Sequence, residues 1–120
     1  MATSNKARVE ELNQMVQNGK AMDAFERFYA EEVVMQENDH PPTAGKAANR
    51  AREIAALSAI VAFRSAKVLS VAEVGDKTFV EWHNDFTHKD YGDRRFHQVA
   101  VQTWKDGKIV HERFYYGDRS

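Results

Sequence analysis

The sequence contains no cysteine, which excludes disulfides, thiol nucleophiles and metal sites built from thiolates. Its six glycines are scattered, so no glycine-rich phosphate-binding loop is present. No apolar run approaches the roughly 20 residues of a membrane-spanning helix, and the first residues lack the apolar core of a signal peptide. We therefore expect a cytoplasmic protein.

The sequence also has no excess of positive or negative charge, because the formal net charge is only -1. Such a balance gives no general attraction to nucleic acid or to an anionic membrane, and we expect neither partner. What is present is ordinary globular composition, with 42% hydrophobic and 29% charged residues. At 120 residues the chain has the size of one domain, which we expect to span residues 1–120.

Three helices are predicted in the first half of the chain. Residues 5–18 and about 21–29 are expected to form a helical hairpin, with Ser4 as the N-cap residue and Gly19 ending the first helix. A third helix over about residues 46–60 is rich in alanine, and small side chains let a helix lie close to what it covers. Its apolar positions are Ile54, Leu57 and Ile60.

Alternating apolar and polar residues predict strands at residues 32–37, 62–74 and 78–88, followed by a hairpin over residues 94–116. The segment 38–45 holds both prolines and a glycine, which exclude regular structure there. Helices followed by a meander of long strands indicate an α+β protein with an antiparallel sheet.

The turn of the last hairpin decides which side chains share a face. We expect a three-residue loop at Lys105, Asp106 and Gly107, with Gly107 in the left-handed conformation of a G1 bulge. A two-residue turn would shift the pairing by one residue. The bulged turn pairs Trp104 with Lys108, Gln102 with Val110, Ala100 with Glu112, Gln98 with Phe114, and Phe96 with Tyr116.

The loop before this hairpin sets the neighbouring register in the same way. With residues 89–93 as the loop, Trp82 lies near Ala100, Asn84 near Gln98, and Phe86 near Phe96. A loop shorter by one residue would turn Glu81, His83 and Asp85 to that face instead. We prefer the first, because it gives the better apolar row.

These elements, in this order, resemble the nuclear transport factor 2-like fold, and within it the SnoaL-like and ketosteroid isomerase-like proteins. The residues that carry the resemblance are the run FYAEEVV at 28–34, Gly45 before the third helix, the run WKDGKIV at 104–110 and the aromatic end at 114–116. The resemblance implies a cone-shaped fold, in which a curved antiparallel sheet is capped by three N-terminal helices and a small, mostly apolar ligand enters the cone.

The resemblance also implies candidate roles. Family members include isomerases, cyclases, dehydratases and epoxide hydrolases, and also binding or assembly modules. In the isomerases an acid at the end of the short strand acts as the base, and Glu37 corresponds most nearly to it. Their two oxyanion donors fall closest to Leu12 and Ala100, which cannot donate a side-chain hydrogen bond. Steroid isomerisation by that mechanism is therefore disfavoured.

Glu37 and Glu112 are the candidate catalytic residues, because both are predicted to point into the cavity from different strands. Burial in an apolar pocket raises the pKa of a carboxyl group toward neutrality, where it can act as an acid or a base. The structural alternative is that Glu112 bonds a tyrosine or a glutamine and only fixes the pocket, while Glu37 lies at a solvated mouth.

The candidate substrate-binding residues are the amide, hydroxyl and aromatic side chains predicted for the same face. They are Tyr116, Gln102, Gln98, Asn84, Trp82, Phe86, Phe114, Phe28 and Trp104. The opposite face is predicted to pack against a second copy of the chain, through His97, Val99, Val101, His111, Arg113 and Tyr115. Ile109 is expected on that outer face as well.

We expect no metal and no cofactor. The five histidines include His83, His97 and His111 on neighbouring strands, but no helical His-x-x-x-His and no tight histidine and carboxylate motif is present. The sequence thus predicts a pocket protein, an acid/base enzyme acting without a cofactor on a small apolar oxygenated substrate. A non-catalytic ligand-binding or dimerisation module is the alternative.

Overall fold

The computed structural model describes residues 3–117, in which three helices and six strands follow one another along the chain. They are α1 (Asn5–Gln17), α2 (Ala21–Phe28), β1 (Tyr29–Glu37), β2 (Thr43–Ala44), α3 (Lys46–Ser58), β3 (Ile60–Val74), β4 (Lys77–His88), β5 (Gly92–Lys105) and β6 (Lys108–Tyr116).

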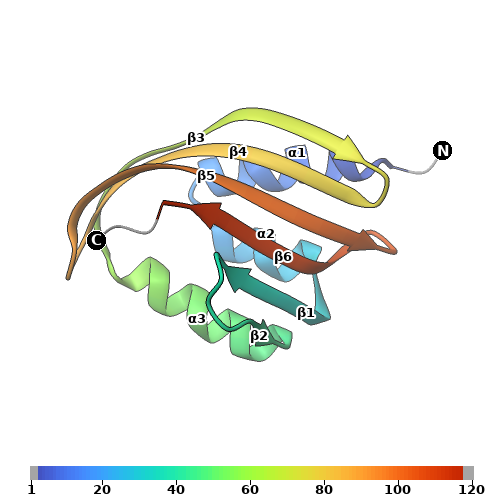
Figure 1. Cartoon of the computed structure of the whole chain (residues 1–120), viewed down its shortest axis with the longest axis horizontal. Coiled ribbons are helices and arrows are strands. Elements are labelled where there is room, and N and C mark those ends of the chain that lie inside the picture. The colour runs from blue at the N-terminus through green and yellow to red at the C-terminus, as the bar shows by residue number, and fades with distance from the viewer. Residues whose placement is uncertain (1–2, 118–120) are drawn as a thin grey trace.

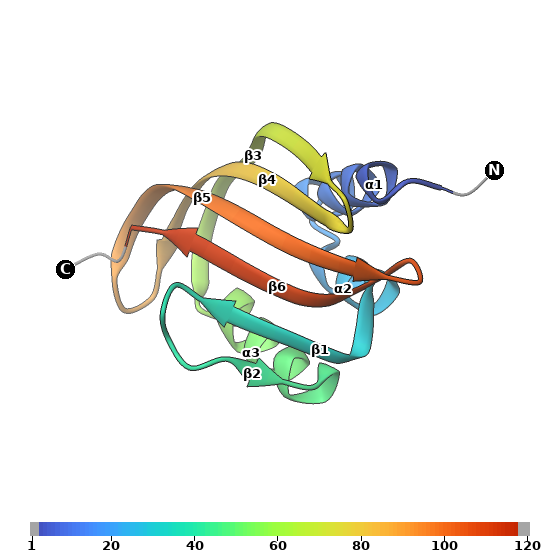
Figure 2. The same cartoon turned by 45° about the vertical axis from the view of Figure 1, so that its right-hand side comes forward.

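The strands form one curved sheet in the order β2-β1-β6-β5-β4-β3, and the helices lie on its concave side (Figures 1 and 2). The predicted α+β class and the helix-capped curved sheet are confirmed. The sheet is not wholly antiparallel, because β1 pairs in parallel with β6, with Met35 opposite Glu112. This parallel pair places the end of β1 beside the end of β6, where the cavity described below opens.

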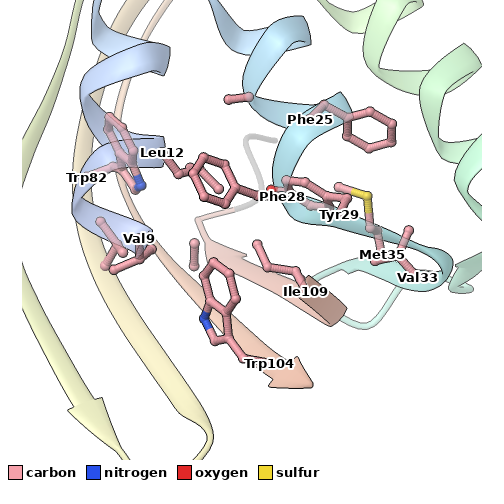
Figure 3. Close-up of a cluster of buried hydrophobic side chains, with 13 residues drawn as sticks. Val9, Leu12, Phe25, Phe28, Tyr29, Val33, Met35, Trp82, Trp104 and Ile109 are labelled. Carbon is pink, nitrogen blue, oxygen red and sulfur yellow. The ribbon is translucent and has the colours of Figure 1, made fainter. Parts of the chain in front are cut away.

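The helical hairpin forms as predicted. The Ser4 side chain accepts a hydrogen bond from the Ala7 amide at 3.0 Å, which caps α1. Gly19 has a φ of 79°, a left-handed conformation that ends the helix at low cost for glycine. The buried core lies between this hairpin and the sheet (Figure 3). It is built from Val9, Leu12, Ala24, Phe25, Phe28, Tyr29, Val33, Met35, Val80, Trp82, Ala100, Trp104 and Ile109.

Helix α3 buries a different face from the predicted one. Ile54 and Leu57 are 49% and 40% exposed, whereas Lys46 and Asn49 are buried. The Asn49 amide donates hydrogen bonds to the carbonyl oxygens of Thr43 and Gly45 at 2.9 and 2.8 Å. The prediction was wrong because these carbonyl groups, at the short strand β2, require a polar partner from the helix. Strand β2 itself corrects the expectation that segment 38–45 has no regular structure.

The turn of the last hairpin also differs from the prediction. Lys105 pairs with Lys108 across a two-residue turn, in which Asp106 and Gly107 both have positive φ. An extra residue in β6, Val110, then shifts the register again, so that Gln102 pairs with Glu112 and not with Val110. The two shifts together restore the predicted face from Glu112 onward. Ile109, expected on the outer face, is instead fully buried.

The pairing of β4 with β5 is displaced by two residues from the prediction. Trp82 lies opposite Gln98, Asn84 opposite Phe96 and Phe86 opposite Arg94. Gly92 pairs with His88, so the loop is shorter than expected by two residues. An even shift leaves each side chain on its predicted face, because side chains alternate with a period of two.

Within residues 3–117, no helix is long and apolar enough to cross a membrane.

Candidate acid/base cavity

A cavity of about 690 Å³ lies between the concave face of the sheet and the three helices. This volume is in the ordinary range for small-molecule sites. Its closed end is formed by buried residues of α1 and α2, such as Leu12 and Phe25. At its open end Leu57, Phe63 and Tyr91 are 40%, 57% and 71% exposed. Apolar side chains therefore contribute to both ends, and the entrance lies between α3, β3 and the β4–β5 loop.

Most of the side chains predicted for the site line this cavity. The two carboxylates and seven of the predicted binding residues do so, namely Glu37, Glu112, Tyr116, Gln102, Gln98, Asn84, Trp82, Phe86 and Phe114. Phe28 and Trp104 do not. Their rings pack edge to face at 6.2 Å in the core beneath α2, because the helical hairpin covers that part of the sheet directly.

A chain of buried hydrogen bonds ends at the cavity wall. The Trp104 indole N–H donates to the Thr78 hydroxyl at 2.8 Å, and that hydroxyl donates to Gln102 Oε1 at 2.7 Å. Gln102 Nε2 donates to Glu112 Oε2 at 2.8 Å, and the Tyr29 hydroxyl donates to Glu112 Oε1 at 2.5 Å. Tyr29, Gln102 and Glu112 are buried, and all three line the cavity.

The order of donors in this chain fixes where Glu112 can carry a proton. Since the Thr78 hydroxyl receives the indole N–H, its own proton goes to Gln102 Oε1, and Gln102 must present its NH₂ group to Glu112 Oε2. A proton on Glu112 therefore belongs on Oε1, facing Tyr29. The Tyr29 oxygen then accepts from Glu112, and its own O–H is released toward the cavity. The ionisation of Glu112 thus sets the direction in which Tyr29 donates.

Burial brings the ionisation of Glu112 near neutral pH, because it raises the pKa of this carboxyl group to about 7. The hydrogen bonds from Tyr29 and Gln102 favour the charged form and oppose this shift. The nearby charge of Glu53 raises the pKa further. Burial, with the negative charge of Glu112, holds the pKa of Tyr29 well above its usual value. Tyr29 therefore acts only as a neutral hydroxyl.

Glu53 is a further carboxyl group that lines the cavity, from helix α3, and sequence reasoning missed it. It projects from α3 into the cavity and is only partly exposed. Burial, and then the charge of Glu37, raises the pKa of Glu53 to about 7, while Arg52 opposes the shift. The signal that could have found it is the spacing of Asn49, Glu53 and Ala56 along one side of α3, which all line the cavity.

The sequence places Tyr29 at the end of the second predicted helix, over about residues 21–29, and not among the candidate site residues. The structure ends α2 at Phe28 and makes Tyr29 the first residue of β1. A single residue thus separates a core ring from a cavity hydroxyl, because the change from helix to strand turns consecutive side chains in different directions.

Glu37 lies at the mouth of the cavity, on the last residue of β1. Its Oε1 accepts a hydrogen bond from the Tyr116 hydroxyl at 2.7 Å, and its Oε2 lies 3.6 Å from an Arg52 guanidinium nitrogen. The Glu37 side chain is 45% exposed. The structure thus has both features of the alternative in which these carboxyl groups are structural. Glu112 accepts hydrogen bonds from a tyrosine and a glutamine, and Glu37 lies at a solvated mouth.

No group of three or more histidine, aspartate and glutamate side chains among residues 3–117 is placed to hold a metal ion.

Comparison with known proteins agrees with the architecture. A protein from Mesorhizobium loti provisionally named a SnoaL-like polyketide cyclase is 22% identical, with a TM-score of 0.78 over 95% of this chain and 100% of its own. A nuclear transport factor 2-like protein of unknown function from Burkholderia xenovorans is 20% identical, with a TM-score of 0.73 over 94% of this chain and 84% of its own. These similarities show the fold alone.

An LEH-like epoxide hydrolase from M. tuberculosis is 16% identical, with a TM-score of 0.75 over 93% of this chain and 81% of its own. No curated protein matches the chain at a significant level. The sequence profile of the SnoaL-like domain matches residues 9–112, which is most of the chain. The chain therefore belongs to the SnoaL-like domain family of the nuclear transport factor 2-like superfamily.

Proposed function

We propose that the protein is an acid/base enzyme that acts on a small, apolar, oxygenated molecule, with its own side chains supplying both the acid and the base. The observation that carries the proposal is the pair of Tyr29 and Glu112, joined at 2.5 Å and facing a cavity of about 690 Å³. The names of similar structures, polyketide cyclase and epoxide hydrolase, are of the same chemical kind.

In this proposal Tyr29 acts as the hydrogen-bond donor to the substrate oxygen. With Glu112 protonated on Oε1, the Tyr29 O–H points into the cavity and meets a carbonyl, hydroxyl or epoxide oxygen. Negative charge that develops on that oxygen is stabilised by a short donor in a site from which water is largely excluded. Tyr29 and Glu112 thus take the place of the oxyanion donors that are missing at Leu12 and Ala100.

The base in this proposal is Glu53. Its pKa of about 7 means that it is ionised in a substantial fraction of molecules at neutral pH, yet basic enough to accept a proton. Glu37 is the alternative base expected from the family resemblance. Its bond to Tyr116 and its contact with Arg52 suit it better to positioning Tyr116 at the mouth.

Titration of the carboxyl groups tests the proposal without a known substrate. We expect ¹³C NMR of protein labelled at the glutamate side-chain carboxyl to find two groups that titrate near pH 7, which disappear in Glu112→Gln and Glu53→Gln respectively. Ordinary titration of both groups, near pH 4 to 5, would sink the assignment.

Turnover provides the second test. A panel of apolar ketones, followed by deuterium incorporation from D₂O, and of epoxides, followed by hydration, samples the two reaction types. We expect Glu53→Gln to lower any observed turnover by at least about 100-fold, the usual contribution of a positioned acid or base. Glu37→Gln is the matched control, with a smaller loss. Equal turnover in wild type and Glu53→Gln would contradict the role of Glu53 as the base.

A non-catalytic binding protein is the second candidate. What favours it is that both Glu112 oxygens already accept hydrogen bonds from the protein. It predicts tight binding of an apolar ligand with no chemical change, and binding that is indifferent to Glu53→Gln. The turnover panel separates the candidates, because a non-catalytic protein binds such compounds without converting them.

A second copy of the chain is the proposed macromolecular partner. The outer face of the sheet carries Val99 and Tyr115, which are 38% and 43% exposed, with Val101 beside them. Light scattering after size-exclusion chromatography should give the mass of a dimer, and Val99→Glu should give that of a monomer. A monomeric mass for the wild type at the highest concentration measured would refute this surface.

A further inference from the structure

Two side chains in the cavity wall carry buried polar atoms that have no hydrogen-bond partner and no part in the acid/base network. These atoms are Oδ1 and Nδ2 of Asn13 on α1 and Nε of Arg94 on β5. Buried polar groups are nearly always hydrogen-bonded, and one that faces a cavity without a partner indicates what the cavity accepts. We infer that the substrate is an apolar carboxylate that also carries a hydroxyl group, with Arg94 binding the carboxylate and Asn13 the hydroxyl.

Asn13 lies at the closed end of the cavity. Its residue is only 3% exposed, and neither its Oδ1 nor its Nδ2 has a hydrogen-bond partner. Its neighbours in the wall include Leu12 and Val16, which offer no polar group from their side chains. An amide presents one acceptor and one donor side by side, and a hydroxyl is the smallest group that both donates and accepts. A hydroxyl at the buried end of a ligand therefore satisfies Asn13.

Arg94 lies nearer the entrance, opposite Phe86 and on the inner face of β5. Its Nε is buried and unpartnered, and its guanidinium carbon lies 5.2 Å from the centre of the Phe96 ring. Stacking on Phe96 holds the guanidinium plane against the wall while leaving its edge available.

The acidic residues close to Arg94 in sequence are engaged elsewhere. Asp85 contacts Arg64 at 2.7 Å and Arg95 at 3.3 Å, and Asp93 contacts Arg64 at 3.5 Å. Among residues 3–117, Arg94 is in no ion pair. Arg52, the other arginine of the cavity wall, is matched by Glu37 at 3.6 Å. Arg94 is thus the arginine of the cavity wall that has no carboxylate of residues 3–117 within ion-pair distance, and a substrate carboxylate bound edge-on to the guanidinium supplies one.

Both anchors share one cavity with the proposed catalytic groups, since Asn13, Arg94, Tyr29 and Glu112 all line it. The same lining supplies aromatic and aliphatic side chains, as required for a hydrocarbon skeleton. The inference rests on the proposed function only in treating the bound molecule as a substrate.

Three fluorescent probes test the two anchors separately: 6-hydroxy-2-naphthoate, 2-naphthoate and 2-naphthol. Wild type should bind 6-hydroxy-2-naphthoate most tightly, and 2-naphthoate more tightly than 2-naphthol. Arg94→Gln should weaken both carboxylates about tenfold, the size of a charge-assisted pair, and leave 2-naphthol within about twofold. Arg95→Gln, the same change of charge on the outer face, should alter none of the three.

Asn13→Leu should remove the advantage of 6-hydroxy-2-naphthoate over 2-naphthoate, about fivefold for one hydrogen-bonding group, and should raise the melting temperature of the free protein by about 3 °C by removing an unsatisfied amide. Gln14→Leu, on the exposed side of α1, is its control. Arg94→Lys should retain part of the preference for carboxylates, which shows that the site has kept its fold.

The inference is overturned if wild type does not bind 2-naphthoate more tightly than 2-naphthol, if Arg94→Gln weakens all three probes equally or none, or if the hydroxyl preference survives in Asn13→Leu. Each of these results leaves the titration of Glu112 and Glu53 unaffected. Conversely, ordinary titration of both carboxyls with intact probe selectivity would refute the acid/base activity and keep the ligand class.

Discussion

The concave face of the sheet is divided into a packed half and a hollow half that use the same kinds of residue. In the packed half Trp104 and Phe28 are 3% and 4% exposed and Val9 and Ile109 are fully buried. In the hollow half Phe86 of β4 and Phe96 of β5, the strand that also carries Trp104, form an edge-to-face pair at 5.9 Å that is only partly buried. Aromatic content alone therefore does not distinguish a core from a pocket.

The difference arises from what covers each half. The α1–α2 hairpin packs directly on the packed half and fills it with long side chains (Figure 3). Helix α3 covers the other half with Ala55 and Ala56, whose side chains are too small to fill the space. The end of α3 is tied to the β4–β5 loop by the Lys89 amide, which donates to the Ala59 carbonyl at 2.8 Å. This hydrogen bond fixes the end of α3 beside the loop at the entrance of the hollow half.

Truncating one aromatic residue in each half tests this division most strongly. We expect Trp104→Ala to lower the free energy of unfolding by about 4 kcal/mol, as for other large-to-small changes in a packed core. Phe86→Ala should cost about 1 kcal/mol, the size of one aromatic pair. Urea denaturation followed by circular dichroism measures both. Similar losses in the two variants would show that the hollow half is as tightly packed as the other.

Glu112 lies at the boundary between the two halves, and its burial should make the free energy of unfolding depend on pH. The pKa of Glu112 is raised from 4.5 to about 7, so folded protein binds a proton that unfolded protein has already released in that interval. The stability from this proton is fully present below pH 4.5 and is lost as the pH rises through about 7. Relative to Glu112→Gln, wild type should lose about 3 kcal/mol across that window.

The measurement is the free energy of unfolding of both proteins from pH 4 to pH 8, a range of roughly four units around the titration. Glu37→Gln is the control, since Glu37 is half exposed and Glu112 remains in place. Parallel curves for wild type and Glu112→Gln would mean that the buried carboxyl stays charged when folded, and would remove it from the proposed acid/base pair.

Enlarging one side chain in each half should change the free energy of unfolding least, but should distinguish the two halves most clearly. Val80 is fully buried in the packed half, and Val80→Leu should cost about 1 to 2 kcal/mol through overpacking. Ala56 lines the cavity, so Ala56→Leu should change the free energy of unfolding by less than about 0.5 kcal/mol. It should nevertheless weaken binding of 2-naphthol, since it occupies the same space. An equal cost for both variants would contradict the open cavity.

Much of this architecture is predictable from the sequence because it depends on local chemistry. Ser4 and Gly19 bound α1 as expected, since capping involves only neighbouring backbone groups. The faces of β4 and β5 are also as expected. The β4–β5 register, and the β5–β6 register from Glu112 onward, are displaced by two residues, and an even displacement moves contacts along the strand without turning a side chain to the other face.

The candidate site is less predictable because its residues depend on contacts between distant segments. Glu112 was identified from its face, but its partner Tyr29 lies 83 residues away along the chain. Glu53, Asn13 and Arg94 are polar residues of ordinary spacing, and only the position of α1 and α3 over the sheet makes them part of a cavity wall. Phe28 and Trp104 were wrongly assigned to the pocket, because the sequence does not distinguish an aromatic residue of the core from one, such as Phe86, that lines the cavity.

The sequence by itself determined the α+β class, the helix-capped sheet and the two faces of each long strand, because propensity, capping and alternation are properties of neighbouring residues. The tertiary structure alone decided which half of the concave face is hollow, which carboxyls are desolvated, and which polar groups lack a partner. Those properties depend on the distance between α3 and the sheet, which is set by the whole fold.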